Sequence, residues 1–260
     1  MKISHEVPLC LLKHSLTFND YQFCLPHLLD ENEEYRDHFL KYKNERGYII
    51  MDNSLHELGE AYDRNRLLYW VNNLRPNEFV VPDVWEDKTL SVVNAREWSK
   101  IEFPEEVEKI AVVQGKDLLE MMTCIQTYKD LGYKKFAFSY GASLYNNLFP
   151  HPNKDLGKAL GRIYVISTLY DKGIIHPNDR VHLLGTALPQ EFGWYKGIDF
   201  IESIDTSNPI MAALDGVKYS PFGLKQKPKS NLNNSFDMLN CLIPMDILEH
   251  NVKMFREFTK

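Results

Sequence analysis

The sequence predicts a single (β/α)8, TIM-like barrel, and three observations lead to this α/β fold class. Apolar strand-like segments alternate with segments of helical periodicity, which is typical of parallel strands joined by right-handed crossovers. The length of 260 residues fits one barrel, which commonly takes about 250. Polar residues and glycines stand at the ends of successive predicted strands, where barrel enzymes carry their reactive groups.

Eight segments have the composition of strands. Nearly continuous apolar runs, such as 48–52, indicate a parallel sheet that is covered on both faces. Seven segments are clearly apolar, and 215–220 is a short and weaker eighth. The seven are 6–13, 48–52, 78–83, 109–115, 134–139, 180–185 and the stretch that begins at Gly197 and stops at Asp205. Residues 21–27 are predicted to form a loop packed onto the barrel.

Helical periodicity and capping residues predict the intervening helices. In the clearest one, Asp117 can cap the N-terminus and Gly132 ends the helix. The predicted helices are 31–46, 63–74, 88–100, 117–131, 155–172, 189–195 and 244–258. The barrel core is expected over about 6–220, a basic loop over 220–235, and one domain over 1–260.

Bulk composition excludes several classes of protein. A net charge of −6 argues against a general nucleic-acid coat but leaves room for a local basic groove. No apolar run approaches the roughly 18 residues of a membrane span, and no secretory signal is visible. Four scattered cysteines favour reduced thiols in a cytoplasm, and these are Cys10, Cys24, Cys124 and Cys241.

Sequence motifs for common cofactors are missing. The chain has no Gly-x-Gly-x-x-Gly, P-loop or Gly-x-Ser-x-Gly motif, and no His-x-x-x-His or His-x-His spacing. We therefore expect neither a cofactor nor a bound metal. His182, inside an apolar strand, is expected to be a satisfied core or pocket-wall histidine rather than a ligand.

Polar residues and glycines at strand ends form the candidate site. They are Asp52, Asp83, Gln114, Gly115, Gly185 and Asp205. Because the carboxyl ends of parallel barrel strands converge on one face, we expect these residues to face one pocket. Like charges placed together raise one another's pKa, which suits a nucleophile and an acid/base that share a site. Each aspartate alone has an alternative interpretation as a helix cap or turn former.

Short motifs surround these strand ends in a particular order. They are Met51-Asp-Asn-Ser-Leu-His-Glu57, Asp83, Val113-Gln-Gly115, a looser Ser139-Tyr-Gly141, Leu183-Leu-Gly-Thr-Ala187 with Pro189-Gln-Glu191, and Ile204-Asp-Thr-Ser-Asn-Pro209. Together they resemble the tRNA-guanine transglycosylase superfamily, and more closely its compact phage-type members that act on 7-deazaguanines in DNA. The resemblance covers about residues 45–220.

The resemblance implies exchange of guanine for a 7-deazaguanine base through a covalent intermediate. Asp205 would be the nucleophile, and Asp52 would protonate the departing guanine and deprotonate the incoming base. Asp83 and Gln114 would hold the guanine-like edge. The further substrate-binding residues would be Gly115, Gly185 and an aromatic such as Tyr140, or else Trp85. We expect phosphate contacts from Lys218, Lys225, Lys227 and Lys229. The alternative is that these lysines belong to a solvated loop that binds nothing.

Two alignments of the nucleophile motif are possible. The Asp-x-x-x-Pro spacing selects Asp205, whereas an ungapped alignment on Gly197-Ile-Asp199 selects Glu202. Asp205 is preferred because Glu202 falls inside the apolar run. The family's zinc-binding module and the Thr-Arg after its proline have no counterpart, and Glu57 replaces a glutamine.

The resemblance favours DNA over tRNA as the substrate, with a homodimer or a partner subunit as the assembly and no membrane association. Three alternatives stay open: a tRNA-guanine transglycosylase, a nucleic-acid N-glycosidase that uses water as the acceptor, and a non-catalytic nucleic-acid-binding subunit.

Overall fold

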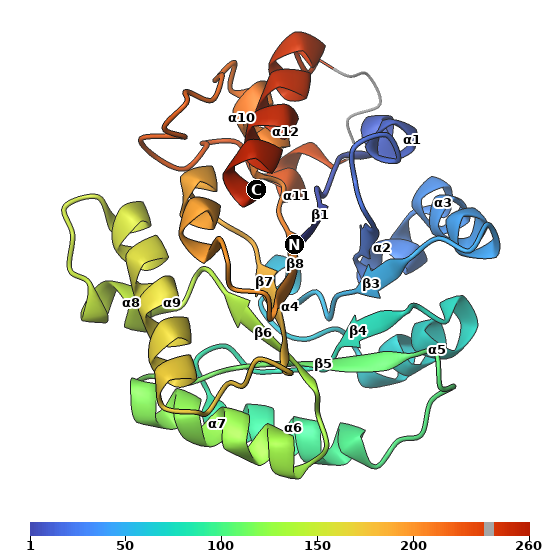
Figure 1. The fold of residues 1–260 in the computed structure, drawn as a ribbon. Helices are drawn as coiled ribbons and strands as arrows, with labels where there is room; N and C mark the ends of the chain where they lie inside the picture. The colour runs from blue at the N-terminus through green and yellow to red at the C-terminus, as the bar shows by residue number, and fades with distance from the viewer. Residues whose placement is uncertain (237–241) are drawn as a thin grey trace. The chain divides into compact units, whose positions relative to one another are not determined.

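The structure is a computed structural model, and it describes residues 1–236 and 242–260 (Figure 1). Eight parallel strands alternate with helices in a (β/α)8, TIM-like barrel, so the predicted fold class is confirmed. The strand order is β1-β8-β7-β6-β5-β4-β3-β2. Cys241, predicted to be a reduced thiol, lies outside the described residues. Within the described part of the chain, no helix combines the length and apolar character that a membrane crossing requires.

The strands are short and lie in the order of the chain. Their bounds are β1 Lys2–Ser4, β2 Gln22–Cys24, β3 Ile49–Met51, β4 Glu78–Val80, β5 Glu108–Val112, β6 Lys135–Ser139, β7 Arg180–Leu184 and β8 Ile201–Asp205. The chain packs as two compact units, a terminal unit of residues 1–20 and 138–260 and a central unit of residues 21–137.

In the central unit, α3 (Glu33–Asn44), α5 (Arg64–Leu74), α6 (Lys88–Ser99) and α7 (Leu118–Asp130) follow successive strands. Side chains at their N-termini accept hydrogen bonds from first-turn N–H groups, as the sequence suggests for Asp117. The capping residues are Asn32, Asp63, Asp87 and Asp117. The short helices α2 (Pro26–Glu31) and α4 (Leu55–Leu58) complete this unit.

In the terminal unit, the long helix α9 (Lys154–Asp171) packs on α8 (Ser143–Leu148), and α12 (Met245–Thr259) packs on α10 (Asn208–Leu214). A 3-10 helix, η2 (Pro189–Tyr195), lies against both α9 and α12. The remaining short elements are η1 (Leu9–Leu11), α1 (Leu12–Ser15) and α11 (Leu232–Ser235).

Two predicted strands are wrong. In the segment 6–13, residues 9–11 form η1 and residues 12–13 begin α1, and the leucines of both are buried as helical side chains. Residues 215–220 follow α10, and the N–H groups of Gly216 and Val217 close the helix by bonding to the carbonyl oxygens of Ala213 and Ala212 at 2.9 and 2.8 Å. Gly216 has a φ of +68°, so this is a Schellman-type helix end rather than a strand.

The two strands that complete the barrel lie near the N-terminus. β1 begins before residue 6, the predicted start of the core, and pairs with β8 through Ser4 and Asp205. Residues 21–27, predicted as a loop, contain β2, which pairs with β3. β8 itself begins at Ile201 and not at Gly197, because residues 197–200 turn and Gly197 has a φ of +79°.

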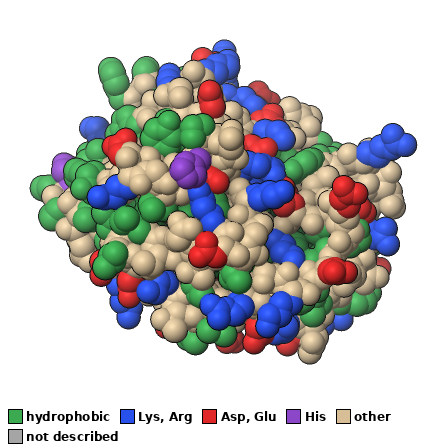
Figure 2. Space-filling model, turned by 60° about the horizontal axis from the view of Figure 1, so that its bottom comes forward, with side chains coloured by type: hydrophobic (Ala, Val, Ile, Leu, Met, Phe, Trp, Pro, Cys, Tyr) green, Lys and Arg blue, Asp and Glu red, His purple; other side chains and the backbone are tan. Residues whose placement is uncertain are grey.

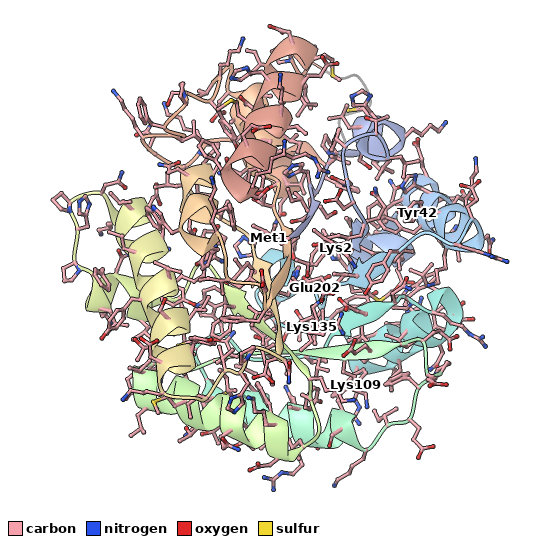
Figure 3. All side chains as sticks on the ribbon, in the orientation of Figure 1. Met1, Lys2, Tyr42, Lys109, Lys135 and Glu202 are labelled. Carbon is pink, nitrogen blue, oxygen red and sulfur yellow. The ribbon has the colours of Figure 1, made fainter. Side chains whose placement is uncertain are left out.

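Ion pairs stand toward the amino ends of strands within each unit. In the central unit, Nζ of Lys135 lies 2.5 Å from Oε2 of Glu78, with both side chains buried. In the terminal unit, Glu202 on β8 lies 2.8 Å from Arg180 on β7 and 4.0 Å from Lys2 on β1. Figure 3 shows Lys2 and Glu202 beside each other.

Candidate functional site

In the central unit, polar side chains that follow β3, β4 and β5 meet around Asp83. The Asn53 amide donates to Oδ1 of Asp83 at 2.6 Å, and the Gln114 amide donates to Oδ2 at 2.6 Å. Asp52 lies beside them on the chain and is also buried. We call Asp52, Asn53, Asp83 and Gln114 the amide–carboxylate cluster. The structure thus brings together three of the predicted site residues, with Asn53 added.

Backbone N–H groups fix the orientation of both amides. Oε1 of Gln114 accepts from the N–H of Glu86 at 2.9 Å, and Oδ1 of Asn53 accepts from the N–H of Leu55 at 3.0 Å. Because each amide oxygen faces a donor, each amide nitrogen must face Asp83. Asp83 therefore serves as an acceptor on both oxygens. The remaining lone pairs of this carboxylate suit a ligand that presents adjacent N–H groups.

Burial makes both acids of the cluster weak. Burial, with a smaller contribution from the nearby charge of Asp52, raises the pKa of Asp83 to about 7, although the two amide hydrogen bonds lower it. Burial likewise raises the pKa of Asp52 to about 6, although the N–H groups of Ser54 and Asn53 lower it. A carboxyl group with such a pKa can both give and take a proton near neutral pH.

The turn after Asp52 is held in an unusual conformation. Ser54 has a φ of +60°, its N–H donates to Oδ2 of Asp52 at 2.9 Å, and its hydroxyl bonds to Nδ1 of His27 at 2.7 Å. A left-handed serine costs energy that the surrounding contacts must offset. This turn therefore holds one oxygen of Asp52 in place.

Gly115 allows the chain to turn closely after β5. A Cβ at this position would lie 2.9 Å from both Cβ of Glu120 and the backbone nitrogen of Met121 in α7. Gly115 therefore allows the chain after Gln114 to pack closely against the start of α7.

In the terminal unit, Asp205 ends β8 and is bonded to a buried histidine. Nε2 of His182 lies 3.0 Å from Oδ1 of Asp205, and Nδ1 lies 2.8 Å from the hydroxyl of Ser203. His182 pairs with Ser203 in the β7–β8 register, and Ser203 and Asp205 share one face of β8. We call Ser203, His182 and Asp205 the His–Asp cluster.

The direction of these hydrogen bonds follows from the groups involved. An ionised Asp205 only accepts, so Nε2 of His182 donates to it. In a neutral imidazole, Nδ1 then accepts, and the Ser203 hydroxyl donates. The hydrogen-bond chain that runs from Ser203 through His182 therefore ends on Oδ1 of Asp205 and restrains the orientation of the carboxyl group.

Gly185 and Tyr140 are in direct contact. Gly185 has a φ of +63°, and a Cβ there would lie 2.6 Å from Cδ1 of the Tyr140 ring. The Gly185 N–H donates to the carbonyl oxygen of Asp205 at 3.1 Å, and the Tyr140 N–H donates to that of Leu184 at 3.0 Å. Two predicted substrate-binding residues therefore lie next to the predicted nucleophile within the terminal unit.

A buried arginine donates hydrogen bonds to the backbone at the carboxyl ends of β6 and β7. The Arg162 guanidinium, from α9, donates to the carbonyl oxygens of Phe138, Leu184 and Gly185 at 3.0 to 3.2 Å. Its Nε donates to Glu191 at 2.7 Å, and both side chains are fully buried. Thr186 and Tyr195 complete the hydrogen bonding of Glu191. Arg162 thus fixes the ends of β6 and β7.

The four lysines predicted to contact phosphates are all exposed, and they are Lys218, Lys225, Lys227 and Lys229. The structure brings one of them to a predicted site residue. Nζ of Lys227 donates to the Tyr140 hydroxyl at 2.6 Å and lies 4.9 Å from the ring centroid, while Lys158 of α9 lies 5.9 Å from the same centroid. Elsewhere, basic and acidic side chains are interspersed over the face drawn in Figure 2.

The alternative nucleophile, Glu202, lies in a different setting from Asp205. It is the second residue of β8 and forms an ion pair with Arg180, whereas Asp205 is at the carboxyl end of the strand. Trp85 is exposed in the turn after Asp83.

Sequence reasoning gave no role to two residues that support the site and did not identify the partner of a third. His182 was expected to be a satisfied histidine, and it is satisfied, but by the predicted nucleophile. Asn53 and Arg162 received no role at all. The sequence did contain one signal for His182 and Arg162, because a histidine or arginine among apolar residues must find buried hydrogen-bond partners.

No model of a known protein family matches the chain, and no curated protein is significantly similar to it. A function for this chain is therefore inferred from the amide–carboxylate cluster, the His–Asp cluster and the motifs that surround them.

Proposed function

We propose that this protein is a base-exchanging glycosyltransferase that replaces guanine with a 7-deazaguanine in DNA. The observation that carries the proposal is that two unlike carboxyl groups stand at strand ends, one in each unit. Asp205 is oriented by His182, and Asp52 has a pKa raised to about 6 by burial. Base exchange needs these two functions, a fixed nucleophile and a reversible proton donor.

In the first half of the reaction, a carboxylate oxygen of Asp205 attacks C1′ of the deoxyribose. The C1′–N9 bond breaks, its electron pair stays on the guanine, and the carboxylic acid of Asp52 supplies the proton that the guanine needs. The products are free guanine, ionised Asp52 and an Asp205–deoxyribosyl ester. A raised pKa keeps part of Asp52 protonated near neutral pH, as this step requires.

In the second half, the Asp52 carboxylate removes a proton from N9 of the incoming 7-deazaguanine. N9 attacks C1′, the ester bond breaks, and its electrons return to Asp205. The His182 N–H donates to the carboxylate that reforms, so His182 favours release of the sugar. Both catalytic groups end in their starting protonation states.

The amide–carboxylate cluster supplies a matching edge for guanine-like bases. Asp83 can accept from the adjacent ring N–H and exocyclic amine of the base. Gln114 uses one amide hydrogen on Asp83 and has a second that can donate to the base carbonyl oxygen. Adenine presents no such N–H pair on a single edge, so this arrangement favours guanine and its 7-deaza analogues.

Incorporation of radiolabelled 7-deazaguanine into duplex DNA, with bulk tRNA in parallel, tests the proposal. Label in DNA, loss of label with Asp205→Asn and retention of label with Glu202→Gln would support it. A protein–DNA adduct on a denaturing gel should disappear with Asp205→Asn only. Label in tRNA alone would favour the tRNA enzyme, and released guanine without label would favour the N-glycosidase.

Absence of both label and release would contradict catalysis by this chain alone. The same assay repeated with a cytoplasmic extract would then distinguish a partner-dependent enzyme from a binding subunit. The proposed compartment is a cytoplasm, where reduced cysteines and DNA coexist.

A further inference from the structure

Residues 216–231, which we call the strap, connect α10 to α11 in the terminal unit (dark orange in Figure 1). The strap contains four lysines and no aspartate or glutamate. It also carries Phe222, whose side chain is 87% exposed. A phenylalanine this exposed forgoes roughly 1.5–3 kcal/mol of burial free energy, which makes a binding role worth testing.

Phe222 stands at the apex of a rigid turn. Ser220 and Gly223 exchange two backbone hydrogen bonds at 3.2 and 2.9 Å, with Pro221 at the second position of the turn. Gly223 has a φ of +84°, and a Cβ there would clash with the Gln190 side chain. Gln190 also bonds to both the N–H and the carbonyl oxygen of Leu224. The aromatic ring is therefore presented by a fixed backbone.

Backbone anchors continue along the strap. Asn153 donates to the carbonyl oxygen of Lys225, Asp155 accepts from the N–H of Lys227, and Asp215 accepts from the N–H of Lys229 at 2.5 Å. Asp155 and Asp215 keep their negative charges in these bonds, but the four lysines of the strap outnumber these two carboxylates. The positive charge of the strap is complementary to a polyanion rather than to a neutral or basic surface.

The strap is connected to the proposed nucleophile through contacts within the terminal unit. Lys227 bonds to Tyr140, the Tyr140 ring packs on Gly185, and Gly185 bonds to the backbone of Asp205. Phe222 precedes Lys227 by five residues, which span at most about 18 Å. That reach corresponds to about five base steps of a duplex, at about 3.4 Å each.

We propose that Phe222 is a wedge that enters the base stack of duplex DNA when the target nucleotide leaves it, while the strap lysines contact the phosphates. This inference rests on the proposed function, because an enzyme that acts on a base must first extract it from the stack. An apolar side chain inserted between base steps offsets part of the lost stacking. A rigid turn favours this role, since the ring then loses little conformational freedom on insertion.

The test compares duplex with single-stranded substrate of the same sequence. Phe222→Ala should lower base exchange on the duplex about tenfold or more, because stacking on an aromatic contributes that much per base. Exchange on the single strand, which needs no extraction, should stay within about twofold. Phe222→Trp should retain duplex activity. Leu119→Ala, which truncates another exposed apolar residue (67% exposed, in the central unit), is the matched control.

A binding measurement distinguishes failure of this inference from failure of the proposed function. Fluorescence anisotropy with a duplex that contains one abasic site measures insertion without catalysis. Weaker binding by Phe222→Ala but not by Leu119→Ala would support the wedge even if the wild-type protein exchanged no base. Equal duplex exchange and equal abasic-site binding by Phe222→Ala and wild type would overturn it. An effect confined to tRNA would overturn it as well.

Discussion

Nε2 of His182 lies 3.0 Å from Oδ1 of Asp205, and the two side chains are 0% and 6% exposed. A hydrogen bond to a buried charged group is stronger than one between neutral groups, since little water competes for either partner. In the proposed reaction, His182 would hold Oδ1 of Asp205 and so orient the carboxylate toward the substrate. In this proposal it is a positioning residue that acts through Asp205.

Replacement of His182 tests this role. His182→Phe keeps the buried volume but removes the donor, so we expect kcat for base exchange to fall about 10- to 100-fold. His182→Gln, whose amide can donate to Asp205, should recover part of the loss. Stopped-flow and quench measurements should show slower decay of the covalent adduct in His182→Phe, because release of the sugar loses its donor. An unchanged adduct lifetime would contradict the role.

The fixed amides around Asp83 lead to a second prediction. In Asp83→Asn, the new amide nitrogen must face either Asn53 or Gln114, and both are held as donors by backbone N–H groups. We expect the free energy of unfolding to fall by about 1–3 kcal/mol, measured by urea denaturation.

A double variant makes the same prediction sharper. When Asp83→Asn is combined with Gln114→Glu, the carboxylate introduced at position 114 accepts both from the Glu86 N–H and from the amide introduced at position 83. Each donor then meets an acceptor again, so the double variant should be more stable than the sum of the two single changes predicts. It should still fail to bind guanine, because the acceptor that Asp83 supplies is lost. Additive free energies would show that the donor pattern is not fixed.

The raised pKa of Asp52 predicts a particular pH dependence of stability. Its pKa is about 6 in the folded protein and about 3.9 when unfolded, so the folded state binds more protons between these values. The stability contribution of this group is therefore present below about pH 4 and is lost as the pH rises to about 6.

Burial lowers the pKa of His5 to about 3, so the stability contribution of His5 changes with pH in the opposite direction. A comparison of wild type with Asp52→Asn isolates the contribution of Asp52, because His5 is present in both proteins. The difference in unfolding free energy between wild type and variant should change between about pH 4 and 6, with a slope of up to about 1.4 kcal/mol per pH unit. Asn keeps an oxygen for the Ser54 N–H, which makes the change nearly isosteric. A difference that does not vary with pH would mean that Asp52 titrates normally.

The buried pair of Arg162 and Glu191 predicts a large loss on truncation. Arg162→Met leaves Glu191 charged and buried without its partner, so we expect the free energy of unfolding to fall by about 3–5 kcal/mol. Adding Glu191→Gln should reduce that loss, since an uncompensated charge no longer remains. Urea denaturation checks both variants, and equal losses would show that the three carbonyl contacts of Arg162, rather than the charge of Glu191, determine the cost.

The sequence was sufficient for the fold class and for much of the amide–carboxylate cluster. Asp52, Asp83 and Gln114 were predictable because each stands at the end of a strongly apolar run that is typical of a buried parallel strand. β1 and β2 were missed because three residues contain too little alternation to distinguish a strand from a loop. The strand prediction for residues 215–220 was wrong because a glycine with apolar neighbours also occurs where a helix ends.

The partners of the site residues were harder to predict than the residues themselves. His182 meets Asp205 only through the register of β7 and β8, which neither segment specifies alone. Likewise, Asn53 reaches Asp83 only because β3 and β4 pair side by side, which neither segment specifies alone. Such pairings depend on tertiary structure, so they became visible only in the folded chain.

The anchoring of the strap has an evolutionary consequence. Its path is fixed through backbone N–H and carbonyl groups at Leu224, Lys225, Lys227 and Lys229, which any residue except proline supplies in full. Leu224 is buried, but the exposed side chains at positions 225, 227 and 229 can therefore change without loss of these backbone contacts. Related chains could acquire new substrate preferences by point changes in the strap, at little cost to the barrel that supports it.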